Sequence, residues 1–281
     1  MLAICDYNLV YEAPLKKAIN QGWLVPFRYY AIFDETVNYE TIDYRNGKYQ
    51  TTQLEEALSI HKRADLIFSH YKKYRSTRAM GFCMSKHHAE FMADYFVKHG
   101  VSACAVYSGD EGVHNTAREK ALSKLVKGEI NVIFSVDMFN EGLDIASLDM
   151  VMMLRPTESP TIFLQQLGRG LRLYKDKHYL NVLDFIGNYK KANFSPYLMT
   201  GASKSQFKKA SDVIKEDSLL PEDCIMDFDF RLIDLFEKMD HSSIKIEKLL
   251  VEEYERIKAE LGHRPSRTCL LYTSPSPRDY A

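Results

Sequence analysis

Two arginines, three residues apart, are the side chains whose type and spacing point most directly to chemistry. Arg169 and Arg172 follow Gln165 and stand beside two glycines in the run 165–172. An arginine guanidinium stays charged at physiological pH, and its planar fork of N–H donors fits the oxygens of a phosphate group. The pair could therefore enter a phosphate site supplied by a neighbouring unit. The alternative is that both are ordinary surface arginines, solvated or paired with carboxylates.

A helix is predicted to position these arginines. Ser159 followed by Pro160 is typical of a helix start, with serine as the N-cap and proline in the first helical position. Apolar residues at the spacing of one helical face follow. Gly168 and Gly170 predict that the helix ends near them, because glycine is a poor helix former. The arginines are then expected in the last turn and in the bend after it.

Three sequence runs resemble those of superfamily 2 helicases and translocases. Residues 165–172 match motif VI, Q-x-x-G-R-x-x-R, residues 139–145 (FNEGLDI) resemble motif V, and residues 81–85 (GFCMS) with Ala89 resemble motif IV. They occur in the family's order and at its spacing. The runs LRPTES and DFIGN further resemble the restriction-type DEAD/DEAH helicases. The resemblance covers roughly residues 5–267 and implies a motor driven by ATP and Mg²⁺.

The resemblance assigns roles in ATP hydrolysis to five residues. Arg169 and Arg172 would be arginine fingers that neutralise charge on the γ-phosphoryl group, with Gln165 close to that group. Gly142 would permit a tight turn after a strand, and Asp144 would accept a hydrogen bond from the nucleotide ribose or bind a motif VI arginine. A helix-surface amide is the alternative for Gln165, and a helix cap is the alternative for Asp144.

Two serines are the expected nucleic-acid contacts. Ser85 and Ser135 each end a predicted strand, and ligands of open parallel sheets lie at the carboxyl ends of strands. Both match positions at which the family places small hydroxyls against the nucleic-acid backbone, a contact that positions the strand without reading its sequence. Ordinary capping at a strand end is the alternative for each serine.

Residues 76–190 alternate short apolar runs with helical patterns. Such runs are expected when both faces of a strand are covered, and the alternation predicts a parallel sheet with right-handed crossovers. The fold class is therefore α/β, with helices on both faces of the sheet. The resemblance identifies this region as the second of the two RecA-like domains of the superfamily. Strands are predicted at 79–84, 101–107, 130–136, 150–154 and 180–185, and helices at 86–99 and 118–127.

Residues 1–75 are expected to form a mixed α+β segment in front of that domain. A buried strand is predicted within 24–33, a hairpin around Asn46-Gly47, and one helix from a Thr52–Glu55 capping box to about Tyr74. The basic residues of that helix are interpreted as a solvated face rather than a phosphate track. They are Lys62, Arg63, Lys72, Lys73, Arg75 and Arg78.

Residues 191–268 read as a helical extension typical of the family and cut short, with amphipathic helices predicted at 207–214, 230–239 and 244–261. Residues 269–281 lack periodicity and contain Ser-Pro-Ser-Pro. This last run resembles translated sequencing-adapter read-through, and a native disordered tail is the alternative. The chain is therefore divided into 1–75, 76–190, 191–268 and 269–281.

Composition limits the remaining classes of function. Charged residues make up 27% of the chain, the net charge is −1, and no apolar run reaches membrane-spanning length. With no global basic field, any nucleic-acid contact must use a local groove. The five cysteines are scattered and form no CxxC, which argues for reduced thiols, a cytoplasmic location and no metal site.

Two parts of a complete ATP site are missing from the sequence. It contains no G-x-x-x-x-G-K-[ST] phosphate loop and no D-E-x-[DH] magnesium motif. The chain is therefore expected to be a fragment, inactive alone, whose ATP and Mg²⁺ need a first RecA-like domain. The predicted function is the carboxyl-terminal half of an ATP-dependent helicase or translocase, with DNA preferred to RNA as the expected substrate.

Two other classes of function stay open from the sequence. One is a non-catalytic module that binds nucleic acid or a protein partner through a RecA-like fold. The other is a Rossmann-type cofactor enzyme. It is disfavoured because no G-x-G-x-x-G follows the first strand of any unit.

Overall fold

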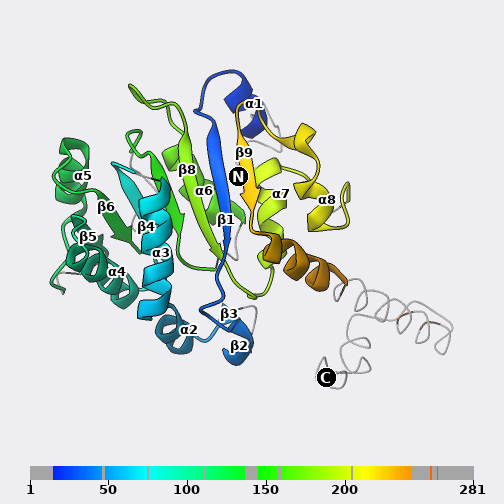
Figure 1. Ribbon diagram of the computed structural model, residues 1–281, viewed down its shortest axis with the longest axis horizontal. Coiled ribbons are helices and arrows are strands. Elements are labelled where there is room, and N and C mark those ends of the chain that lie inside the picture. Colours follow the sequence, from blue (N-terminus) through cyan, green and yellow to red (C-terminus); the bar gives the residue numbers. More distant parts are fainter. Residues whose placement is uncertain are drawn as a thin grey trace.

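A seven-stranded sheet organises the computed structural model (Figure 1). The structure describes residues 15–45, 48–74, 76–109, 112–136, 145–156, 160–203 and 205–241, together with Tyr254 and Lys258. The strand order is β5-β6-β4-β7-β8-β1-β9, and all the registered neighbours in this sheet are parallel. The predicted parallel α/β fold is therefore confirmed.

The strands are β1 (Phe27–Phe33), β2 (Tyr44–Arg45), β3 (Lys48–Tyr49), β4 (Ala79–Phe82), β5 (Ala103–Val106), β6 (Val132–Ser135), β7 (Met150–Met153), β8 (Leu180–Ile186) and β9 (Ile225–Phe228). The α-helices are α1 (Leu15–Asn20), α2 (Thr51–Leu58), α3 (His61–Tyr74), α4 (Lys86–Lys98), α5 (Arg118–Lys127), α6 (Pro160–Gly170), α7 (Ser195–Thr200) and α8 (Ala210–Ile214). Short 3-10 turns lie at η2 (Tyr39–Thr41), η3 (Ala192–Phe194) and η4 (Asp217–Leu219), and residues 230–241 are helical.

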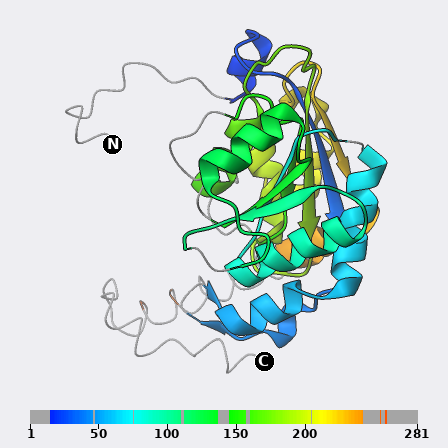
Figure 2. The ribbon, with the colours of Figure 1, turned by 90° about the vertical axis from the view of Figure 1, so that its left-hand side faces the viewer.

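Helices cover both faces of the sheet (Figures 1 and 2). On one face α3 and α4 bury apolar side chains, such as Ile67 and Phe96, against the strands. On the other face α5, α6 and α7 contribute a second cluster that includes Leu125, Phe163 and Met199. The residues of β4, β6, β7 and β8 are all buried, as continuous apolar strands covered on both faces should be.

The sheet is wider than residues 76–190 alone would make it. β1, from the leading segment, pairs with β8 over seven residues, from Phe27 with Leu180 to Phe33 with Ile186. β9, from the region read as a helical extension, then pairs with the outer side of β1. The sequence pattern did not predict β9, because Ile225 and Asp227 are exposed at the sheet edge and give the run no buried apolar character.

Two expectations for residues 50–74 were wrong. The predicted single helix is two, α2 and α3, separated at Ser59 and Ile60. The Thr52–Glu55 capping box does not form, because the Gln50 side chain caps α2 by accepting from the Gln53 backbone N–H. The Glu55 carboxylate instead accepts a hydrogen bond from the Ser85 hydroxyl.

The prediction of a solvated basic face on the helix is also wrong for Arg63. Arg63 is fully buried on α3, whereas Lys62, Lys72 and Lys73 are exposed. Its Nε lies 2.7 Å from a carboxylate oxygen of Asp34, and its Nη2 donates to the Leu154 carbonyl at 3.1 Å. A buried charge needs such partners. The arginine therefore ties α3 to the chain just beyond β1 and β7.

The predicted hairpin is present as the antiparallel pair β2 and β3, although Asn46 and Gly47 lie outside the described residues. So do residues 269–281 and, apart from Tyr254 and Lys258, the predicted helix 244–261. Among the described helices, none combines the length and apolar content that crossing a lipid bilayer would require.

Candidate functional site

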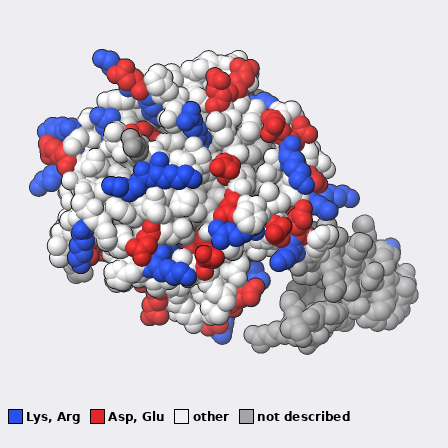
Figure 3. Space-filling view, in the orientation of Figure 1, with Lys and Arg blue, Asp and Glu red and all other residues white. Residues whose placement is uncertain are grey.

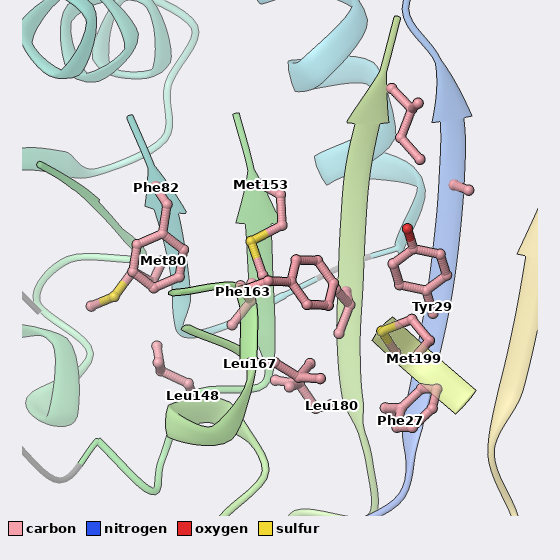
Figure 4. Close-up of a cluster of buried hydrophobic side chains, with 14 of the residues drawn as sticks. Phe27, Tyr29, Met80, Phe82, Leu148, Met153, Phe163, Leu167, Leu180 and Met199 are labelled. Atoms are coloured by element: carbon pink, nitrogen blue, oxygen red, sulfur yellow. The ribbon is translucent and has the colours of Figure 1, made fainter. Parts of the chain in front are cut away.

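Helix α6 carries the motif-like residues, and two apolar side chains fix it to the sheet. Phe163 is 1% exposed and Leu167 is fully buried. Figure 4 shows both side chains among Met153, Leu148 and Leu180, over the strands. Pro160 begins the helix, and the helix ends at Gly170, both as predicted. The anchored face leaves the opposite face of α6 outward.

The end of α6 lies at the amino end of the sheet. The Val25 backbone N–H donates to the Leu171 carbonyl at 2.8 Å, and Leu24 forms an isolated bridge with Arg172. Gly170 packs against the first residue of β8, since a Cβ at this glycine would lie 2.6 Å from Leu180 Cδ1. The glycine thus permits the close approach that fixes where the arginines leave the helix.

The three predicted phosphate-directed residues lie on this segment with graded exposure. Gln165 and Arg172 are exposed, and Arg169 is half-buried. Gln166, beside them, is 1% exposed, and its side-chain oxygen accepts no hydrogen bond from the described residues. Charged and amide donors at the outer end of a packed helix could contact an anionic group, so the chemistry fits a phosphate. Their catalytic roles stay predictions.

A lysine that the sequence analysis did not single out holds the end of α6. The Lys177 Nζ donates to the carbonyls of Gly170, Ala146 and Arg172, the last two at 2.9 and 3.1 Å. Burial lowers the pKa of Lys177 from its ordinary value of 10.5 to about 8, and the Asp149 carboxylate partly opposes this shift. No motif marks such a lysine, because all three of its partners are backbone atoms.

A hollow of about 440 Å³ adjoins this lysine at the amino end of the sheet. It is lined by the segments around Arg78, Asp149, Lys177 and Asn181. Asp149 organises one wall by accepting from the Ser76 hydroxyl and from both the backbone and the hydroxyl of Thr77. The hollow is therefore built from the turns that precede β4, β7 and β8.

The two predicted nucleic-acid contacts lie at the other end of the sheet. Ser85 follows β4 and caps α4, because its hydroxyl accepts from the His88 backbone N–H. The same hydroxyl donates to the Glu55 carboxylate of α2. A carboxylate in that place would repel a phosphate. The geometry is that of the capping alternative, and a phosphate contact by Ser85 requires Glu55 to move away.

Ser135 ends β6 opposite Phe82 of β4 and is 1% exposed. Its hydroxyl has no hydrogen-bond partner among the described residues. The strands place both serines together at the carboxyl end, where α2 and the β2–β3 hairpin also lie (Figure 1). They do not approach Arg169 and Arg172, which lie beyond the amino ends of β1 and β8. Gly142 and Asp144 lie outside the described residues.

Within the described ranges, no group of three or more histidine, cysteine or acidic side chains is arranged to hold a metal ion. Burial raises the pKa of the Cys104 thiol and of the Cys224 thiol to about 11, so both sulfurs stay protonated at neutral pH.

Comparison with protein families identifies the region that contains these residues. Residues 50–174 match the model described as the helicase conserved C-terminal domain. The match runs from α2 to just beyond Arg172, so it includes the motif IV, V and VI runs and the end of α6. The sequence resemblance to superfamily 2 helicases is confirmed.

This chain is also similar to individual helicases and restriction enzymes. A Saccharomyces cerevisiae protein named "Putative ATP-dependent helicase IRC3" is 25% identical over 184 residues, which are 64% of this chain and 26% of that protein. A DNA-bound Type ISP restriction-modification enzyme, LlaBIII, superposes with a TM-score of 0.52 at 14% identity, covering 97% of this chain and 22% of that one.

A fragment of a type I restriction enzyme HsdR subunit from Vibrio vulnificus superposes with a TM-score of 0.51 at 21% identity, covering 79% of this chain and 39% of that one. At these identities, the two solved structures establish the shared fold. The chain spans about a quarter of the yeast relative's length and well under half of either solved chain.

Proposed function

We propose that this chain supplies the carboxyl-terminal half of an ATP-dependent DNA helicase or translocase. The observation that carries the proposal is the end of α6, where Gln165, Arg169 and Arg172 lie at the outer end of a helix anchored by Phe163 and Leu167. The match of residues 50–174 to helicase C-terminal domains supports the same assignment.

The proposed reaction is attack of water on the γ-phosphorus of ATP, which breaks the bond to the β–γ bridging oxygen and yields ADP and phosphate. Arg169 and Arg172 would stabilise the charge that develops on the phosphoryl oxygens, and Gln165 would lie close to the γ-phosphoryl group. Mg²⁺ supplies further charge neutralisation when bound. Its ligands and the phosphate loop are proposed to come from a first RecA-like domain, as in the superfamily that this chain resembles.

DNA is proposed as the substrate over RNA. The restriction-type sequence runs LRPTES and DFIGN carry this preference, and the DNA-bound restriction enzyme with the same fold is compatible with it. The face shown in Figure 3 interleaves lysine and arginine with aspartate and glutamate, so no single-sign surface dominates it. Binding is therefore proposed to use local phosphate contacts near the carboxyl end of the sheet.

Steady-state ATPase measurement tests the proposal. We expect the chain alone to be inactive, and the chain joined to a first RecA-like domain of the superfamily to hydrolyse ATP faster when single-stranded DNA is present. Stimulation by RNA alone would correct the substrate. An inactive joined protein that still binds oligonucleotide would favour the non-catalytic binding module. Oligonucleotide affinity should fall steeply with added salt, because phosphate contacts release counterions.

A further inference from the structure

We propose that Lys177 is a positioning residue for the α6 arginines. Its single ammonium group holds the last carbonyl of α6, the backbone of Arg172 and the loop before β7 in one fixed arrangement. The inference rests on the proposed function, since it concerns the placement of Arg169 and Arg172. None of the matched motif runs contains Lys177.

The geometry of the contact matches a lysine ammonium. A lysine ammonium carries three N–H donors and no acceptor, and Lys177 has three carbonyl partners, at Ala146, Gly170 and Arg172. The last carbonyls of a helix have no partner within the helix, and positive charge at that end is favourable. Lys177 therefore satisfies the carboxyl end of α6 where the chain turns toward β8.

The same contact joins two segments that are distant in sequence. Ala146 comes directly after the run that resembles motif V, and Gly170 and Arg172 belong to the run that resembles motif VI. A displacement of about 1 Å at a catalytic group can cost on the order of 10²-fold in rate. A fixed link between the two backbones can thus set how far Arg169 and Arg172 reach toward a phosphate.

The link depends on charge, because a neutral amine has only two N–H groups for the three carbonyls. Lys177 is half-buried, and the Asp149 carboxylate favours its charged form, so the link should weaken as pH rises through the lysine's lowered pKa. Other charged or titratable side chains in and around the same hollow are Arg78, Arg172, Tyr174, Lys175, Asp176, His178 and Tyr179.

Hydrogen exchange on the 281-residue chain tests the link itself. In Lys177→Met, the amides of residues 145–149 and 165–174 should exchange several-fold faster than in the wild type. Lys175→Met is the matched control, because Lys175 is exposed and its removal changes net charge equally. Unchanged exchange in Lys177→Met would overturn the proposal. Exchange that rises throughout the chain would mean general destabilisation, and would overturn it equally.

Kinetics of the joined protein test positioning. Lys177→Met should lower kcat about tenfold or more with ATP affinity changed less than twofold, because the arginines act mainly on the transition state. Wild-type turnover should fall as pH rises through about 8. Lys177→Arg, charged at all these pH values, should recover part of kcat and lose that alkaline decline. Equal losses in kcat and affinity, or an unaltered decline in Lys177→Arg, would overturn the role.

The two experiments separate this inference from the proposed function. If the joined wild-type protein fails to hydrolyse ATP, the proposed function fails, and the exchange experiment still decides whether Lys177 links the two segments. If the joined protein is active and Lys177→Met behaves like Lys175→Met in both experiments, only the positioning role fails.

Discussion

The candidate residues at the two ends of the sheet differ in their accessibility. At the carboxyl end, Ser85 is engaged by the His88 N–H and the Glu55 carboxylate, and Ser135 is buried. At the amino end, Gln165 on α6 and Arg172, two residues beyond that helix, are exposed, and Lys177 holds the end of the helix. The carboxyl end holds its polar groups inside the fold, whereas the amino end presents them outward.

This difference separates the position of a residue from its availability. The predicted strands placed both serines correctly at the carboxyl ends of β4 and β6, where ligands of parallel sheets usually lie. It could not indicate that α2 would bring a carboxylate to Ser85, since Glu55 lies 30 residues earlier in sequence. At the amino end, in contrast, Arg169 lies in the last turn of α6 and Arg172 lies two residues beyond it, so their short separation in sequence already places both at one helix end.

The largest expected effect is at the amino end. In the joined protein, Arg169→Ala or Arg172→Ala should lower ATP turnover on the order of 10²-fold or more, while ATP affinity changes little, because an arginine finger meets charge that develops in the transition state. Lysine at either position should rescue poorly, since it lacks the planar fork. Steady-state kinetics, nucleotide binding and a thermal melt should be recorded for each variant.

Near-wild-type turnover in both variants would remove the finger assignment. A collapsed melt would instead indicate that the arginines stabilise the fold. This outcome is expected more for Arg169 than for Arg172, because Arg169 is half-buried. Ser85→Ala in the same protein, assayed without DNA, is the control from the other end of the sheet, and it should leave turnover within about twofold because its hydroxyl caps a helix.

The second effect concerns the close packing of Gly170, the last residue of α6, against Leu180 at the amino end of the sheet. Gly170→Ala should destabilise the chain by about 1–3 kcal/mol, because the added methyl group would overlap the Leu180 side chain. The measurement is the midpoint of chemical denaturation at constant slope. Wild-type stability in this variant would mean that Leu180 can move aside and that the glycine is not required for the close approach.

Periodicity predicted much of the fold, and long-range contacts account for what it missed. β6, β7 and α5 lie within the predicted ranges, and β8 extends one residue beyond its range, because buried apolar runs and amphipathic helices carry their own local signal. β9 was missed because half of its side chains are exposed at the sheet edge. Arg63 was misread because its partners, Asp34 and the Leu154 carbonyl, lie 29 and 91 residues away.

The site was predictable to the extent that a motif lies on one element. The run 165–172 indicated the α6 arginines correctly as neighbours at a helix end. Lys177 carried no sequence signal, because its role comes from three backbone carbonyls brought together by the fold. The end of α6 was predicted near Gly168 and Gly170, and the helix ends at Gly170.

The third effect compares the two serines at the carboxyl end. Ser85→Ala should lower the free energy of unfolding by about 1 kcal/mol, since it removes the N-cap of α4. Ser135→Ala should stay within about 0.5 kcal/mol of wild type, because it deletes a buried hydroxyl that has no partner among the described residues. Parallel urea titrations check this. If Ser135→Ala weakens binding of single-stranded DNA and Ser85→Ala does not, Ser135 is the contact.

The smallest effect distinguishes the two glycines of α6. Apart from the adjacent residues and the nearby backbone of α6 itself, no described atom lies within 4 Å of where a Gly168 Cβ would be, whereas Gly170 is packed against Leu180. Gly168→Ala should therefore stabilise the chain by about 0.5–1 kcal/mol, because alanine is the better helix former. A thermal melt beside Gly170→Ala would show the opposite signs directly.

The same substitution then tests what approaches the outer face of α6. In the joined protein, the added methyl group stands next to Arg169, on the side proposed to face the phosphate. If that side is closely approached, Gly168→Ala should raise the melting temperature and yet lower turnover several-fold. Higher stability with unchanged turnover would mean that nothing comes close to Gly168, and the arginines would then have to reach the phosphate across a gap. Lower stability in Gly168→Ala would contradict the open space beside Gly168 on α6.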